Sequence, residues 1–144
     1  MTHKPLLTIK KKCSGRDSQG HISVRHQGGQ HKRFLRQIEW NRNRLDTQAK
    51  VVSIEYDPNR TADIALLVYE NGAKSYILST TNLKVGDTVV SAVQAPIKDG
   101  NCLPLKNIPI GVPIHAISFQ VGKPAQIVKT AGSAAFIQSI DGDK

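Results

Sequence analysis

Apolar residues are sparse in the first quarter of the chain and then recur with the short period of β-strands. Residues 51–56 alternate with period two, which predicts a strand with Val52, Ile54 and Tyr56 on one face. The sequence DPNR follows, and because Pro58 presets its own φ angle, a turn is expected there.

The clearest hairpin pattern lies in ADIALLVYENGAKSYIL, residues 62–78. Two apolar runs flank Asn71-Gly72, a pair preferred where both turn residues need positive φ. The first run is apolar on both faces, which favours a central strand. A further turn at Gly86-Asp87 precedes another strand. Residues 34–93 are therefore expected to form about five short strands, the pattern of a small barrel or sandwich.

A second unit is expected from residue 104. The prolines Pro104, Pro109 and Pro113 predict an extended linker rather than a helix. Three strand-like runs follow, which are residues 114–121, 125–130 and 134–140. Since three strands are too few to close a barrel, we expect an open edge near Phe136–Ile140, beyond which Asp141-Gly142 is a hairpin-turn signal.

The segment GRDSQGHISVRHQGGQHKRFLR, residues 15–36, has almost nothing apolar to bury. Without burial it cannot offset its conformational entropy, so in isolation it is expected to be disordered. The net charge of +9 is unevenly spread: residues 1–60 carry 13 Lys and Arg against five Asp and Glu, and residues 61–144 carry seven against six. This asymmetry predicts a basic arm on a near-neutral body and a polyanionic partner.

Nucleic acid fits this arm better than a membrane does. Residues 10–36 lack the apolar helical face of a membrane-surface helix, and the chain has no run of about 18 apolar residues. Arg side chains match phosphate geometry and stack on bases, and His side chains hydrogen-bond phosphate or 2′-hydroxyl groups. Gly28-Gly29 would let the backbone pass close to the partner. A solubilising tail is the alternative.

Several other kinds of site have weak support. Cys13 and Cys102 are interpreted as reduced thiols, and the spacing of the arm histidines does not match the close ligand pairs of zinc sites, so no metal or cofactor is expected. Aromatic stacking on single-stranded nucleic acid is a further possibility. We expect Tyr56, Tyr69 and Tyr76 in the core, whereas Trp40 adjoins the basic sequence NRNR, where an exposed ring would lie next to phosphate-binding charges.

The arm sequence resembles the N-terminal motif of the bacterial-type large-subunit ribosomal protein L2 family. The matching residues are Gly15, Arg16, Gly20, Ile22, Ser23, Arg25, His26, Gly28, Gly29, His31, Lys32 and Arg33. The chain departs from the motif at Gln30, where the family has a third glycine. Further matches are EYDPNR at Glu55–Arg60 and GNCLPLKNIPIG at Gly100–Gly111. The resemblance extends from about residue 14 to Lys144.

The resemblance implies an all-β fold with a basic RNA-binding arm at residues 1–33, a five-stranded OB-fold barrel at 34–103, and a linker with an incomplete SH3-like barrel at 104–144. It implies a structural constituent of the large ribosomal subunit that binds ribosomal RNA and supports subunit assembly and the peptidyl-transferase region. We expect RNA contacts from Arg16, Arg25, His26, Gly28, Gly29, His31, Lys32, Arg33, Arg36, Arg42, Arg44, Arg60, Lys106 and Lys129. Other ribosomal proteins are expected partners.

Two alternatives and two finer expectations accompany this interpretation. The first alternative is a free-standing OB-fold protein that binds single-stranded nucleic acid. The second is an enzyme, but His115 with Asp63, or Asp57 with Arg60, lack motif context, so no enzymatic activity is expected. We expect His115 to be a partly buried structural residue and Asp57 to cap the turn at Pro58. We also expect a separate polypeptide to supply the C-terminal half, with RNA, an unrelated protein or the rest of a longer chain as alternatives. The expected location is an organellar ribosome, in the mitochondrial matrix, with bacterial cytoplasm as the alternative.

Overall fold

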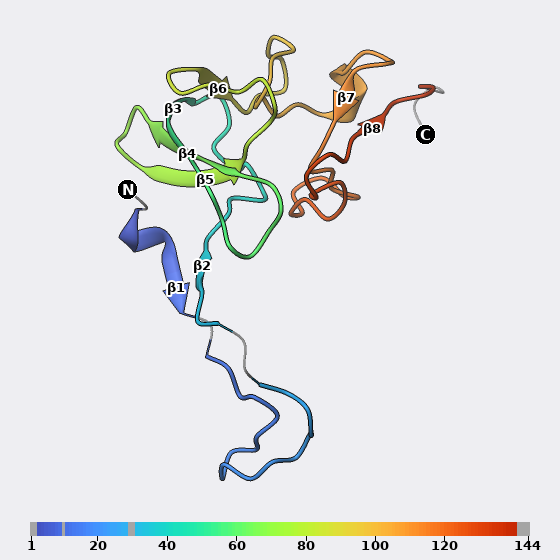
Figure 1. The fold of residues 1–144 in the computed structure, drawn as a ribbon. Coiled ribbons are helices and arrows are strands. Elements are labelled where there is room, and N and C mark those ends of the chain that lie inside the picture. The colour runs from blue at the N-terminus through green and yellow to red at the C-terminus, as the bar shows by residue number, and fades with distance from the viewer. Residues whose placement is uncertain (1–2, 10, 29–30, 141–144) are drawn as a thin grey trace.

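The computed structural model describes residues 3–9, 11–28 and 31–140, and these residues form short strands joined by loops (Figure 1). The elements are η1 (Lys4–Leu6), β1 (Leu7–Ile9), β2 (Phe34–Arg36), β3 (Gln48–Glu55), β4 (Ile64–Tyr69), β5 (Lys74–Leu78), β6 (Thr88–Val90), η2 (Leu105–Asn107), β7 (Pro113–Ile114) and β8 (Ala135–Phe136). The expected all-β class is confirmed. Within the described ranges, no helix is long and apolar enough to cross a membrane.

The centre of the fold is an antiparallel sheet in the order β5-β4-β3-β6. Strand β4 lies between β5 and β3 and is buried on both faces, as its two-sided apolar pattern predicted. The sheet has four strands, so the predicted count of about five is not confirmed. Next to β5, Ile38 forms only a single parallel bridge with Tyr76.

The two faces of β4 belong to two separate apolar clusters. One cluster contains Ala65 and Leu67 and is closed by Leu83 and Val89. The other contains Ile64, Leu66, Tyr76 and Leu78 and is covered by Leu6, Ile38, Trp40 and Ala62. Because Leu6 precedes β1, the segment that leads into β1 packs onto the sheet at this residue.

The hairpin expected around Asn71-Gly72 is confirmed. Strands β4 and β5 pair from Ile64↔Leu78 to Val68↔Lys74. Gly72 has a φ of 76°, whereas the φ of Asn71 is not positive. The Asn71 side chain instead accepts a hydrogen bond from the backbone N–H of Ala73 at 3.0 Å. The turn thus needs positive φ from glycine alone, unlike a turn with two such residues.

A β-bulge in β3 changes the alternation that the sequence predicts. Val51 lies opposite Leu67 and Ile54 lies opposite Ala65, with a register shift between Val51 and Ser53. Val51 and Ile54 therefore share a face although they are three residues apart, since the bulge adds one residue to β3. Among the tyrosines expected in the core, Tyr69 and Tyr76 are buried, but Tyr56, just after β3, is 72% exposed. The expectation for Tyr56 is wrong.

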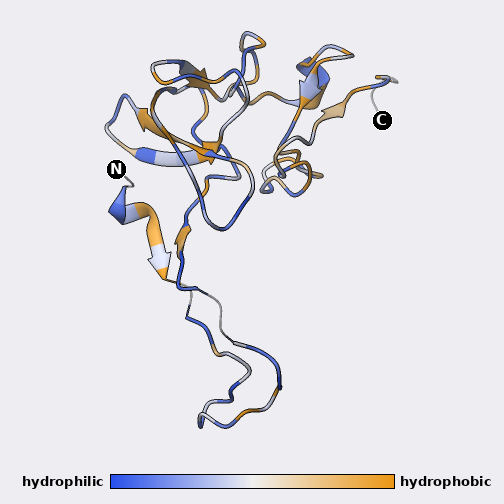
Figure 2. Ribbon diagram, viewed as in Figure 1, coloured by the Kyte–Doolittle hydropathy of each residue, from blue (hydrophilic) through white to orange (hydrophobic). Residues whose placement is uncertain are grey.

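The basic arm is a long loop between β1 and β2 that extends away from the sheet (Figure 1). Figure 2 shows that this loop is mostly hydrophilic, whereas apolar residues concentrate in the strands. Strands β1 and β2 pair antiparallel, with Leu7↔Arg36 and Ile9↔Phe34, across the predicted boundary after residue 33. We call this two-stranded segment the stem of the arm.

The second unit contains less regular structure than its sequence predicts. Strands β7 and β8 pair through Pro113↔Phe136 and Ile114↔Ala135. The expected middle run forms only an isolated bridge, between Ile117 and Ile127. The turn predicted at Asp141-Gly142 lies outside the described residues.

Candidate nucleic-acid interface

The tip of the arm is held together by hydrogen bonds rather than by apolar packing. The carbonyl of Gly15 accepts hydrogen bonds from the backbone N–H groups of Ser23 and Val24 at 2.8 and 3.0 Å. A carboxylate oxygen of Asp17 accepts from the N–H groups of Gln19 and His21 at 2.9 and 2.8 Å. These bonds give the tip a defined backbone path despite its polar composition.

Gly15 is required at the point where the tip closes. Its φ of 68° lies in the region that favours glycine, and a Cβ added there would lie 2.2 Å from the carbonyl oxygen of Val24. A residue with a side chain would not fit here, which explains why the arm motif has a glycine at this position.

One side of the tip forms an open, basic hollow of about 560 Å³. It is lined by Ser14, Arg16, Ile22, Val24, Arg25, His26, Gln27 and Gly28. Arg16 donates to the carbonyl of Gly20 at 3.0 Å, which fixes its guanidinium group at the tip. Within the described part of the chain, Arg25 has no hydrogen bond or ion pair, so its guanidinium group is free to meet a phosphate.

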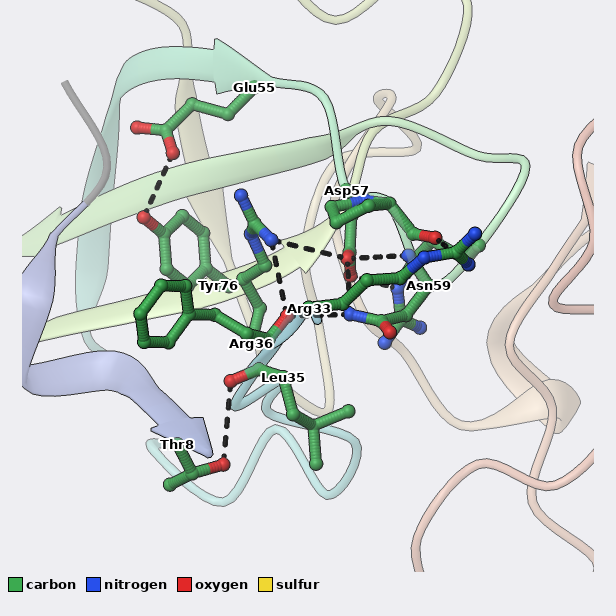
Figure 3. A network of polar contacts seen from close by, with 11 residues as sticks. Thr8, Arg33, Leu35, Arg36, Glu55, Asp57, Asn59 and Tyr76 are labelled. Atoms are coloured by element: carbon green, nitrogen blue, oxygen red, sulfur yellow. Dashed lines mark hydrogen bonds and ion pairs between the residues drawn. The ribbon is translucent and has the colours of Figure 1, made fainter. Parts of the chain in front are cut away.

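Where the arm meets the body, basic side chains from both parts contact groups of the protein itself. Arg33 donates to the carbonyl of Pro58 at 2.8 Å. Arg60 Nε lies 2.6 Å from a carboxylate oxygen of Asp57, and Arg36 Nη1 lies 3.7 Å from the other (Figure 3). The side chains of Arg36 and Arg60 are only 13% and 19% exposed. Because they are mostly buried beside a carboxylate, these two arginines are less accessible to RNA than the resemblance implied.

Asp57 is fully buried and is the common partner of these groups. As the sequence suggested, it caps the turn at Pro58, because its carboxylate accepts from the backbone N–H of Asn59 at 3.0 Å. Burial by itself would raise the pKa of Asp57, but hydrogen bonds from Arg60 and Asn59 outweigh it, and the pKa lies below its ordinary value. Asp57 is therefore a buried anion at neutral pH.

Other predicted contact residues lie on the body of the protein. Arg42 donates to the carbonyl of Gly100 at 3.0 Å, and the Arg44 guanidinium lies 4.6 Å from the centre of the Tyr69 ring. Lys106 is exposed in η2. Lys129 donates to the carbonyl of Ala125 at 3.1 Å.

Two cationic side chains lie near the ring of Trp40. Lys129 Nζ is 4.5 Å and the Arg60 guanidinium 5.5 Å from its ring centres. The carbonyl of Trp40 also accepts a hydrogen bond from the N–H of Ala125 at 3.2 Å. The ring is partly buried between the two units, so it is a weaker candidate for nucleic-acid stacking than the sequence alone indicated.

The predicted contacts thus fall into two groups. The exposed residues are Arg16, Arg25, His26, Gly28, His31 and Lys32 in the arm, of which Arg16 and His31 bond only within the arm, and Lys106 on the body. The residues that contact protein groups of the body are Arg33, Arg36, Arg42, Arg44, Arg60 and Lys129. Gly29 lies outside the described residues. The sequence did not indicate that Asp57 would contact Arg36 as well as Arg60, since Arg36 belongs to β2, far from Asp57 along the chain.

The described residues contain no group of three or more His, Cys, Asp and Glu that could hold a metal ion. Cys13 and Cys102 are free thiols. His115 is half-buried, as expected, and burial together with the charge of Arg42 lowers its pKa although Asp99 opposes the shift.

Two family models and one relative of known family match this chain. Residues 3–91 match the model described as "Ribosomal Proteins L2, RNA binding N-terminal domain", and residues 98–144 match "Ribosomal Proteins L2, C-terminal domain". The chain is 49% identical over 140 residues to "Large ribosomal subunit protein uL2" of Polaromonas sp. (strain JS666 / ATCC BAA-500). The alignment covers 97% of this chain and 51% of the relative, so the chain spans about half the length of that relative.

Two expectations receive no support from these matches. The C-terminal domain model already matches residues 98–144, so nothing indicates that a separate polypeptide supplies this domain. The relative comes from a bacterium, which fits the bacterial alternative and does not support a mitochondrial location.

Proposed function

Because the chain belongs to the ribosomal protein L2 family, we propose that it is a structural constituent of the large ribosomal subunit that binds large-subunit ribosomal RNA. The observation that carries this proposal is the arm, whose exposed basic residues are held on a polar loop that extends away from the apolar clusters (Figures 1 and 2). A polar, basic loop of this kind has too few apolar residues to pack against the protein, so its side chains become buried when it binds a polyanion.

The arm and the body contribute differently in this proposal. Arg16, Arg25, His26, His31 and Lys32 meet phosphate and 2′-hydroxyl groups, and Gly28 and Gly29 admit the RNA backbone. Through these contacts the protein supports subunit assembly and the region around the peptidyl-transferase centre, without enzymatic activity of its own. The alternative of a free-standing single-strand binder needs several exposed aromatic rings on one barrel face, whereas Tyr69 and Tyr76 are buried and Tyr56 alone of the three tyrosines is exposed.

Co-sedimentation tests the proposal. The full chain is mixed with a large-subunit ribosomal RNA transcript, in moderate salt, with a tenfold excess of unstructured poly(U) as competitor. The proposal expects the protein to stay with the ribosomal transcript. Transfer of the protein to poly(U) would instead favour a free-standing single-strand binder.

A further inference from the structure

The direction of the arm is set at its stem, where both strands are fastened to the same end of β3. This end contributes two acidic side chains, Glu55 and Asp57, which lie on either side of exposed Tyr56. Figure 3 shows Glu55 with Tyr76, and Asp57 with Arg36 and Asn59. The stem itself pairs only three residues on each strand, so it is too short to hold a long loop in one direction alone.

Strand β2 is held through the turn that Asp57 caps. The Asn59 side chain donates to Asp57 at 3.1 Å and also to the carbonyl of Phe34 in β2 at 2.7 Å. Arg36, at the end of β2, forms the ion pair with Asp57. Asp57 therefore reaches β2 by a direct charge contact and by a side chain that it orients.

Strand β1 is held through Glu55. The hydroxyl of buried Tyr76 donates to Glu55 at 3.0 Å and accepts from the backbone N–H of His3 at 3.0 Å. His3 precedes η1, which leads directly into β1. The two strands that carry the arm are thus fastened separately, one through each acid.

We propose that Asp57 is a positioning residue for RNA binding: it holds β2, and with it the basic arm, in the direction in which the arm meets RNA. This inference rests on the proposed function. Asp57 is an acid in a protein that binds a polyanion, and its charge alone opposes binding. It acts through Arg36, Arg60 and Asn59, and touches no RNA itself.

Matched variants separate position from charge. Asp57→Asn and Asp63→Asn each remove one negative charge, but Asp63 is exposed and its side chain has no hydrogen bond or ion pair within the described part of the chain. If charge alone mattered, both variants would bind a large-subunit ribosomal RNA transcript as well as or better than wild type. The positioning role expects Asp57→Asn to bind about five- to tenfold more weakly, because the arm must then be ordered during binding.

A second variant, Asn59→Ala, tests the positioning role if Asp57→Asn is too unstable to assay at neutral pH. Asn59 is exposed, and its amide is the link between Asp57 and Phe34. The variant keeps the net charge and the apolar clusters, and it is expected to bind RNA about threefold more weakly. Tighter binding of Asp57→Asn, or unchanged binding of Asn59→Ala, would overturn the proposal.

A distance measurement without RNA keeps this inference separate from the proposed function. Exposed Cys13 at the start of the arm and a Glu70→Cys at the β4–β5 turn carry spin labels, in a Cys102→Ser background. Double electron–electron resonance is expected to give a distance distribution about twofold wider in Asp57→Asn or Asn59→Ala than in the parent, because a loosened stem adds conformers. Equal widths would refute the positioning of the arm by Asp57 even if the parent binds RNA. Failure of the parent to bind RNA would refute the proposed function, and with it the purpose of this positioning, but not the effect of Asp57 on the arm.

Discussion

The arginines predicted to contact RNA have different surroundings in this protein. Arg25 is exposed at the arm tip, whereas Arg36 and Arg60 lie against the buried carboxylate of Asp57. The capping role of Asp57 followed from the sequence because Asp, Pro58 and Asn59 are adjacent. The contact with Arg36 did not, since it joins the end of β2 to a turn far away along the chain and depends on the path of β2.

The buried carboxylate predicts a pH-dependent stability. The pKa of Asp57 is lowered in the fold, so its contribution is complete above the ordinary value of about 3.9 and is lost as pH falls through the folded value. Asp57→Asn is expected to lose about 1–3 kcal/mol of unfolding free energy at pH 7, because charged hydrogen bonds are replaced by neutral ones.

Urea unfolding at pH 7, 5 and 3 measures this difference. The gap between wild type and Asp57→Asn should be the same at pH 7 and 5 and smaller at pH 3. A gap that stays constant down to pH 3 would show that Asp57 does not contribute as a buried anion.

At the scale of elements, the sequence revealed those whose pattern is local. The β4–β5 hairpin was predictable because its turn residues and both apolar runs are contiguous, and the central position of β4 followed from its two apolar faces. Strand β1 was missed, because three residues carry little pattern and its partner β2 lies beyond the whole arm. Tyr56 follows β3, in which the alternate residues Val52 and Ile54 are exposed as well, so the pattern indicated the period of the strand but not which of its faces is buried.

The hydroxyl of Tyr76 is expected to hold β1 in place. Tyr76→Phe leaves the Glu55 carboxylate and the His3 N–H without this partner and should cost about 1 kcal/mol of unfolding free energy. Hydrogen exchange of the β1 amides should become faster, while that of β4 changes only with global stability. Tyr56→Phe is the control, since that side chain is exposed. Equal exchange rates in both variants would contradict this role for Tyr76.

At the scale of the whole molecule, the two units meet at Trp40. Its ring contacts Lys129 and Arg60, and the N–H of Ala131 donates to the hydroxyl of Thr61 at 3.3 Å. The sequence predicted both units and the linker between them. It could not predict this contact, because the aromatic ring and the lysine show no pairing pattern along the chain.

A double-mutant cycle measures that contact. Trp40→Ala and Lys129→Ala are expected to couple by about 0.5–1 kcal/mol in unfolding free energy, the range of a partly exposed cation–π pair. The cycle of Trp40→Ala with Lys106→Ala should show no coupling, because Lys106 is exposed in η2. Equal coupling energies in the two cycles would mean that the Lys129–Trp40 contact does not join the units.

The central claim, that the arm is the main contact with ribosomal RNA, is tested most directly by the salt dependence of binding. Arg25→Ala/Lys32→Ala removes two exposed arm charges, and Lys74→Ala/Lys84→Ala removes two exposed charges from the body. Affinity for a large-subunit ribosomal RNA transcript is measured from low to moderate salt. The arm variant should lose roughly 0.7–0.9 per phosphate contact from the slope of log K against log salt, and the body variant should keep the wild-type slope. An unchanged slope in the arm variant, or equal losses in both, would contradict the claim.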